Sequence, residues 1–151
     1  MKTILIIIIS FLAFSCKTEK VLTDAEIAKN EESASSNIKI LALLGEKSTS
    51  NDAYTITSVE LQENNLIVVV TFSGECMDHE FKATGLTINQ QSTQPIRQIQ
   101  LVHLSNNDKC KKLITQTLEI DIKEIAVNKT VGSKTIFKID GWNDQYEYTV
   151  H

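Results

Sequence analysis

The chain has 151 residues, of which 42% are hydrophobic and 23% are charged, and its formal net charge at pH 7 is −4. This length suits one domain with its own hydrophobic core. The mildly acidic balance provides no basic surface for a phosphate backbone, which argues against a nucleic-acid partner.

The first 15 residues have the features of a secretory signal peptide. Lys2 precedes a continuous apolar run, Ile4–Ile9, which continues to Phe14 and ends at Ser15. A run this short does not reach the ~20 residues that a membrane-spanning helix needs. A buried core helix is the alternative, but the abrupt change to the polar sequence KTEK favours a signal peptide that is removed.

Cys16 follows the apolar run directly. The sequence Ala13-Phe14-Ser15-Cys16 resembles the lipobox of bacterial lipoproteins, although Phe14 is bulkier than the usual residue there. In such lipoproteins the Cys thiol takes a diacylglyceryl group, the signal peptide is removed and the new amino group is acylated. The resemblance implies lipidation of Cys16 and a stable membrane anchor, because each buried CH₂ contributes about 0.8 kcal/mol. It also implies a Gram-negative cell envelope location, at the outer membrane.

The mature chain divides into a tether and a domain. Residues 16–37 are polar and poor in apolar side chains after Cys16, which is typical of a flexible tether. A short helix over Thr23–Asn30 is compatible with this interpretation. We expect residues 38–151 to form the folded domain.

The first part of the domain contains strand patterns. The apolar run Ile38–Leu44 is too short to separate a strand from a short helix. Tyr54–Leu61 changes parity midway, which predicts a β-bulge near Thr57–Ser58. Leu66–Phe72 is apolar on both parities, which predicts a central strand buried on both faces.

The second half continues the pattern of short strands. We predict further strands over residues 80–88, 96–104, 118–122, 134–140 and 145–150. Pro95 stands at a strand entrance, where a missing N–H is tolerated. One helical turn is predicted within Asn107–Ile114, with Asp108 as its cap. About seven strands indicate an all-β sandwich of the immunoglobulin-like type.

The two remaining cysteines, Cys76 and Cys110, favour a disulfide because the chain is exported and their number is even. Cys76 follows the predicted central strand, and Cys110 follows the strand over residues 96–104. If both strands end on the same side, the sulfurs can meet. Such a bridge contributes ~3–4 kcal/mol on the chain-entropy model.

A metal site is the alternative use of the same cysteines. Cys76 and His79, with His103 and Cys110, have the residue types of a zinc site, and Asp78 or Asp108 could support the ligands. This hypothesis needs both thiols reduced, which an exported compartment disfavours. Its function would be periplasmic metal binding.

Catalysis is the third hypothesis for this group. Cys76 and His79 could form a nucleophile and its base, but a second Cys within reach would consume the thiol. The sequence contains no G-x-S-x-G, H-E-x-x-H or phosphate-binding glycine loop. We therefore expect no enzyme and no cofactor.

The histidines have a structural interpretation. His103 shares strand parity with Ile99 and Leu101, so we expect it to point toward the core. His79, His103 and Asp108 would then be supporting polar residues, hydrogen-bonded to one another or to the backbone near the bridge.

Aromatic residues near the C-terminus provide a candidate binding surface. Trp142 in a turn and Tyr146 or Tyr148 beyond it could form a platform for a sugar or peptide. The alternative is that Trp142 covers one end of the core.

The segment from Tyr54 to Ile125 resembles a group of small Bacteroidetes-type lipoproteins without an assigned activity. Their pattern runs Gly-x-Cys-x-x-His-x-Phe, then Leu-x-His, then Asp-x-Cys. The matching residues here are Gly74, Cys76, His79, Phe81, Leu101, His103, Asp108 and Cys110. Glu75 stands where the second Gly of that group usually occurs. The resemblance supports the fold and the cysteine pairing and implies no mechanism. We expect a non-enzymatic binding or structural protein whose partner is a protein or a glycan.

Overall fold

The structure is a computed structural model that describes residues 37–86, 88 and 94–151. The predicted signal peptide (1–15), lipidation at Cys16 and almost all of the predicted tether (16–37) lie outside the described residues. Within the described part, no helix has the length and apolar character needed to cross a membrane.

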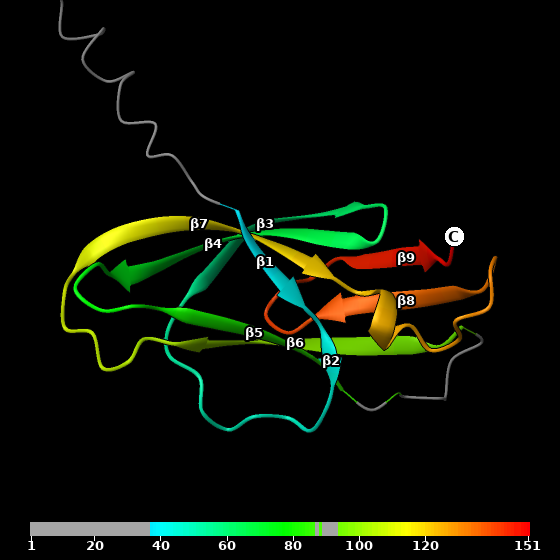
Figure 1. Ribbon diagram of the computed structural model, residues 1–151, viewed down its shortest axis with the longest axis horizontal. Helices are drawn as coiled ribbons and strands as arrows, with labels where there is room; N and C mark the ends of the chain where they lie inside the picture. Colours follow the sequence, from blue (N-terminus) through cyan, green and yellow to red (C-terminus); the bar gives the residue numbers. More distant parts are fainter. Residues whose placement is uncertain (1–36, 87, 89–93) are drawn as a thin grey trace, which may run out of the picture. The chain divides into compact units, whose positions relative to one another are not determined.

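The domain consists of two β-sheets packed face to face (Figure 1). One has four strands in the order β1-β7-β4-β3, and the other has five in the order β2-β5-β6-β8-β9. The strand bounds are β1 Ile38–Leu41, β2 Leu43–Leu44, β3 Thr55–Gln62, β4 Asn65–Gly74, β5 Glu80–Gly85, β6 Ile96–Leu104, β7 Lys112–Asp121, β8 Lys134–Ile139 and β9 Gln145–Thr149. The 3₁₀-helix η2, Lys123–Ile125, follows β7.

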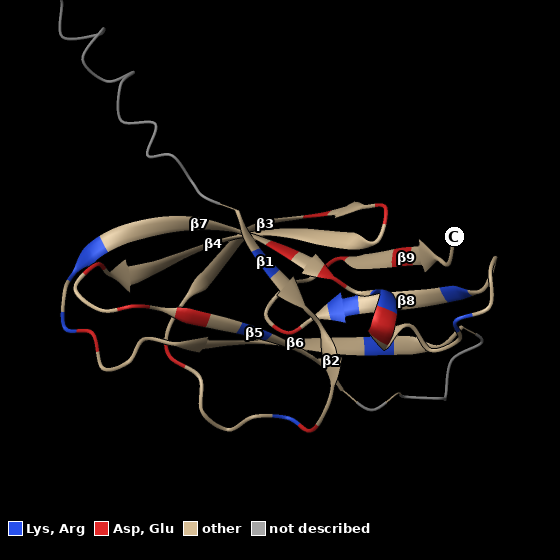
Figure 2. Ribbon diagram, viewed as in Figure 1, with Lys and Arg blue, Asp and Glu red and all other residues tan. Residues whose placement is uncertain are grey.

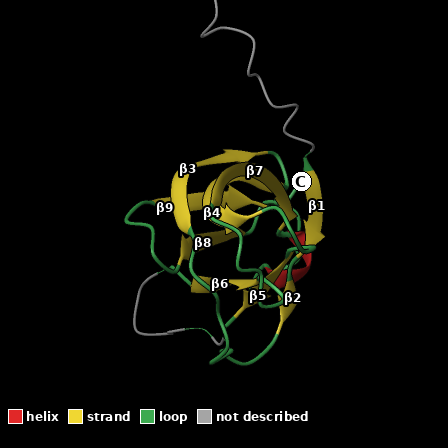
Figure 3. Ribbon diagram, turned by 90° about the vertical axis from the view of Figure 1, so that its left-hand side faces the viewer, coloured by secondary structure: helices red, strands yellow, loops and turns green. Residues whose placement is uncertain are grey.

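The all-β sandwich class is confirmed, and the view along the strands shows the two layers (Figure 3). Three strand pairs, β1 with β7, β2 with β5 and β6 with β8, run parallel. Immunoglobulin sheets are mainly antiparallel, so the sandwich architecture holds while these connections depart from that type.

The segment over residues 38–44 forms two short strands, which resolves the ambiguity of its short apolar run. It pairs first with β7, where Ile38 lies opposite Leu118, and then with β5, where Leu43 lies opposite Thr84. Between them Ala42 is fully buried. The chain therefore closes one side of the sandwich by passing from one sheet to the other.

Strand β4 is central in its sheet, but the prediction that both of its faces are buried is wrong. Leu66, Val68 and Val70 are fully buried, whereas Ile67 and Val69 on the opposite face are only partly buried. The second sheet covers one face alone, and β-branched residues suit a half-exposed sheet surface as well as a core.

Strand β6 is the strand with two covered faces. Ile99, Leu101 and His103 face the core, while Gln100 and Val102 on the other face are also buried. The loop before β3 contributes this cover, because Ser48 accepts a hydrogen bond from Gln100 Nε2 through its carbonyl and donates one to Gln100 Oε1.

The helical turn predicted within Asn107–Ile114 is wrong, because residues 107–111 belong to a non-helical loop and strand β7 follows. The strand begins at Lys112 and pairs with β4 from Gly74 onward, so the ladder satisfies backbone groups that a helical turn would have used. The predicted bulge in β3 is confirmed between Ile56 and Ser58. Strand β5 ends at Gly85, before the predicted end at Ile88.

The core lies between the sheets and is built from aliphatic and aromatic side chains. Its largest fully buried members include Tyr148, Phe137, Leu66 and Ile99. Arg97 is also buried, and its guanidinium donates to the carbonyls of Ile125 and Leu86. Those two bonds provide the partners that a buried cation needs.

Candidate functional site

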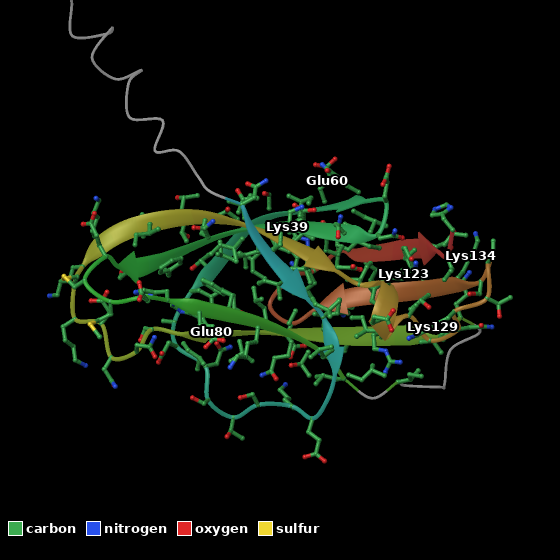
Figure 4. All side chains as sticks on the ribbon, viewed as in Figure 1. Lys39, Glu60, Glu80, Lys123, Lys129 and Lys134 are labelled. Atoms are coloured by element: carbon green, nitrogen blue, oxygen red, sulfur yellow. A yellow bond between two sulfur atoms is a disulfide. The ribbon has the colours of Figure 1, made fainter. Side chains whose placement is uncertain are left out.

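Cys76 and Cys110 form a disulfide with a Cα–Cα distance of 5.9 Å, so the predicted pairing is present in the structure. Cys76 follows the end of β4, and Cys110 precedes the start of β7, which pairs with that end of β4. The bridge thus lies at one end of the sandwich (Figure 4). We call the two segments 74–79 and 105–113 the disulfide end.

Asp108 joins the two segments of the disulfide end. Its side chain has no solvent exposure. Oδ1 accepts the backbone N–H of Cys110 at 2.7 Å, and Oδ2 accepts those of Cys76 and Met77 at 2.9 and 3.0 Å. The Cys110 N–H, then His79 and the other two N–H groups, hold the pKa of the Asp108 carboxyl well below its usual range. One carboxylate therefore fixes both cysteine backbones.

His79 and His103 extend this network into the core. His79 Nε2 lies 3.1 Å from Asp108 Oδ2, and His79 Nδ1 lies 2.8 Å from His103 Nε2. His103 Nδ1 lies 3.2 Å from the Ala53 carbonyl oxygen. The His103 ring also stacks on Phe81 at 4.5 Å between centroids. The prediction that His103 points toward the core is confirmed.

The network defines which atoms carry protons. A carbonyl and a carboxylate accept only, so three simultaneous hydrogen bonds need three ring protons, one more than two neutral imidazoles hold. Burial first, then the neighbouring His79, lowers the pKa of His103. The Asp108 carboxylate accepts from His79 Nε2, and the Ala53 carbonyl accepts from His103 Nδ1.

Gly74 is a site residue whose role the sequence alone does not show. A Cβ atom there would lie 2.2 Å from His79 Nε2 and 3.2 Å from Asp108 Oδ2. Only glycine leaves room for the His79 ring at this position. The neighbouring Glu75 has a φ of 118°. A positive φ of this size favours glycine and is unfavourable for a residue with a side chain.

Asn51 and Asp52, which precede β3, also brace this end. The Asn51 side chain accepts the His103 N–H at 2.8 Å and donates to the Leu101 carbonyl at 3.2 Å. Asp52 accepts both the N–H and the hydroxyl of Ser105 at 2.7 Å. The loop thus follows the edge of β6 in place of another strand, a role that no motif signals.

The predicted four-ligand metal set is not brought together as one group among the described residues. The residues whose potential ligand atoms converge are Cys76, Asp108 and Cys110. The two sulfurs are bonded to each other, and zinc binds the thiolate form of cysteine. All four ring nitrogens of His79 and His103 are used in hydrogen bonds. In this state the residues are suited to bracing rather than to metal binding.

The candidate aromatic platform is tied into the fold. Trp142 and Tyr146 are half-buried against the core. Trp142 Nε1 donates to the Tyr146 hydroxyl, which donates to the Val59 carbonyl in β3. Trp142 therefore covers the core, and with Tyr146 it joins the exposed edge of one sheet to the other.

Two apolar side chains remain exposed at the disulfide end. Met77 is 53% exposed and Leu113 is 70% exposed. Lys109 and Lys111 are exposed beside them. A hollow of about 320 Å³ lies at the same end, lined by residues that include Asp52, Ser73, His103, Asn107 and Lys109. The arrangement is a rigid surface with apolar and basic side chains.

The fold is similar to that of solved Bacteroides proteins. A NigD-like immunity protein from Bacteroides caccae is 16% identical, with a TM-score of 0.58 over 76% of this chain and 64% of that one. A protein of unknown function from Bacteroides vulgatus is 10% identical, with a TM-score of 0.51 over 76% and 58%. The chain thus spans about three-fifths of the length of these proteins. No protein-family profile and no curated protein matches the sequence.

Proposed function

We propose that the protein is a lipid-anchored cell-envelope protein that binds a partner protein, without catalysis, through its disulfide end. One observation carries this proposal. The disulfide, Asp108 and the two histidines brace the loops, while Met77 on one loop and Leu113 at the start of β7 stay exposed. Rigid loops lose little conformational entropy on binding, and exposed apolar side chains with a polar rim are typical of protein interfaces.

The buried polar side chains are hydrogen-bonded within the protein, which supports a role other than catalysis. Among the described residues, every buried side-chain nitrogen or oxygen has a hydrogen-bond partner. A nucleophile needs an accessible thiol or hydroxyl beside a free base. Here both thiols are oxidised, and Asp108 and the histidines are occupied by one another.

The anchor is the second part of the proposal. The lipobox-like sequence ending at Cys16 supports lipidation, and the proposal has the anchored domain on the outer membrane. The net charge of −4 argues separately against a nucleic-acid partner. The expected result is that the mature protein purified from cells carries acyl chains on Cys16, as shown by mass spectrometry. The Cys16→Ser variant should leave the membrane fraction, and its retention there would contradict the anchor.

Photo-crosslinking tests the binding surface. A photoreactive amino acid placed at Met77 or Leu113 should capture one discrete partner in intact cells. The same group at Val131, which is 76% exposed outside the disulfide end, serves as the matched control. Equal capture patterns from all three positions would overturn the proposal. The identity of the partner decides whether the role is the immunity function named for the Bacteroides caccae protein or another binding role.

Zinc binding is the second candidate, because Cys76, Cys110 and Asp108 place their potential ligand atoms within 4.8 Å of one another. Alkylation under denaturing conditions distinguishes the two functions. If Cys76 and Cys110 react without reductant and the native protein has the additional mass of a zinc ion, the metal hypothesis replaces the one above. Complete resistance to alkylation would exclude it.

A further inference from the structure

Three exposed leucines lie close to one another in sequence near the start of the described chain. Leu41 is 52% exposed, and Leu43 and Leu44 are each 59% exposed. They make up half of the six large, exposed hydrophobic side chains of the described residues, yet they fall within four consecutive positions. We call them the leucine edge. An apolar cluster of this kind marks a contact surface.

The backbone at the leucine edge is poorly suited to adding a partner strand. Strand β1 has four residues and β2 has two. Ala42 separates them, and its N–H is already donated to the Asp121 carbonyl as the chain passes between sheets. Because strand addition needs a continuous row of free backbone groups, the leucine side chains are the groups available for contact.

Charges of both signs surround the leucine edge (Figure 2). Lys39 pairs with Glu119 at 3.7 Å, and Asp121 lines the same surface hollow beside Leu41. Glu46 and Lys123 lie in the adjoining segments. Because these charges have both signs, they give no net attraction to anionic headgroups. Any lipid contact here would therefore be made by the apolar side chains.

We infer that the leucine edge inserts into the interface of a zwitterionic phospholipid bilayer when the chain is anchored through Cys16. This inference rests on the anchor proposed above. About 20 residues separate Cys16 from β1, and a flexible chain of that length has a mean span of about 25 Å. The anchor therefore holds the domain at a high effective concentration near the bilayer. Under that condition, even a weak affinity of the three leucines for the lipid interface is sufficient for contact.

The contact would leave the disulfide end free. The leucine edge adjoins the end of β7 at Leu118–Asp121, whereas the bridge adjoins the opposite end of that strand at Lys112. Figure 1 shows the β1–β2 crossing at the middle of the domain, away from the loops that follow β4 and β6. Membrane contact would thus orient the domain with its binding surface accessible.

Quenching by brominated phosphatidylcholine tests the inference. The mature chain is coupled through Cys16 to a maleimide lipid in vesicles, so the test does not depend on lipidation in cells. In a Trp142→Phe background, Leu43→Trp should lose roughly half of its emission, because interfacial side chains lie ~5–10 Å into the headgroup boundary. Val131→Trp, the matched exposed control, should lose far less.

Several results would overturn the inference. Equal quenching at both positions, or none at position 43 on vesicle-bound protein, shows that the edge does not meet lipid. Emission at position 43 that shifts with protein concentration indicates a second copy as its partner. Emission that changes when residues 17–36 are deleted, without vesicles, indicates that the tether covers it.

Hydrogen exchange on the unsubstituted anchored chain provides a second measurement if the tryptophan variants fold poorly. Amides 39–45 should exchange several-fold more slowly on zwitterionic vesicles than after the tether is cut, with the same protection at high salt. Unchanged exchange contradicts the inference. A lack of acyl chains on Cys16 in cells would contradict the proposed anchor instead, so the two failures are distinguishable.

Discussion

Glu75 holds a backbone conformation that suits glycine, and its substitution should stabilise the fold. Its φ of 118° costs an L-residue on the order of 1–3 kcal/mol. We expect Glu75→Gly to raise the free energy of unfolding by about 1 kcal/mol, because glycine loses part of this gain through its freer unfolded chain. Urea denaturation measures the change.

The matched control for this prediction is Glu75→Ala. Glu75 also forms an exposed ion pair with Lys112, which both substitutions remove and which contributes little. Alanine keeps the unfavourable φ, so Glu75→Ala should have no stabilising effect. Equal stabilisation by the two variants would show that the ion pair, and not the backbone, sets the outcome.

Gly74 should be intolerant of even one added methyl group. The Cβ of Gly74→Ala would overlap the His79 ring, so we expect a loss of about 1–3 kcal/mol in unfolding free energy, which is typical of overpacking. The double variant Gly74→Ala/His79→Ala should lose less than the sum of its single variants. Simple additivity in thermal or urea unfolding would contradict this contact.

At the residue scale, the sequence identifies the chemically distinctive residues of the candidate site, but it does not show how they are arranged. Cys76, His79, His103, Asp108 and Cys110 are recognisable because thiols, imidazoles and carboxylates have specific chemistry. Gly74 and Asn51 have no such signal. Gly74 is required because the His79 ring fills the space where a side chain would be, and Asn51 bonds to the edge of a strand about 50 residues away.

At the scale of elements, the carboxylate of Asp108 holds the loop between β6 and β7 in place by accepting the backbone N–H groups of Cys76 and Cys110. The pKa of Asp108 is lower in the folded protein than the value near 3.9 of an unfolded chain. Its contribution is therefore fully present above about pH 4 and is lost as pH falls below that value toward the folded pKa.

Acid unfolding tests this dependence. Asp108→Asn should melt at a lower temperature than the parent protein at pH 7, because Asn cannot pair as an anion with His79. The gap between the two melting temperatures should narrow as pH falls below about 4. A gap that stays constant down to pH 2 would show that the charge of Asp108 is unimportant.

Elements with clear alternation or turn chemistry were predicted well. Leu118, Ile120 and Ile122 alternate with charged residues and are fully buried, as one-sided burial requires. The buried faces of β4 and β6 were harder to predict. Strand β4 is apolar on both faces but covered on one, whereas β6 has polar residues such as Gln100 on a face that is nevertheless covered. That cover comes from residues distant in sequence.

At the scale of the whole molecule, the Cys76–Cys110 bridge connects the two sheets' loops over a separation of 34 residues. Its removal by Cys76→Ser/Cys110→Ser should lower the unfolding free energy by ~3–4 kcal/mol. This is a large part of the 5–15 kcal/mol that holds a typical domain together. Urea unfolding with and without reductant measures it.

The reference for this prediction is the double-serine variant treated with the same reductant. Reductant should lower the urea midpoint of the parent protein to that of the variant and leave the variant unchanged. If reductant has no effect on the parent under denaturing conditions, the bridge is absent in solution.

The sequence by itself determined the all-β class, the strands around residues 56–61, 96–104 and 134–150, and the chemical identity of the cysteine and histidine group. Local periodicity and residue chemistry are sufficient for these. Only the tertiary structure decided the parallel crossings, the role of Gly74 and the His79–His103–Asp108 network. These depend on which segments the fold brings together, from Gly74 beside His79 to β1 beside β7, and no local pattern encodes that choice.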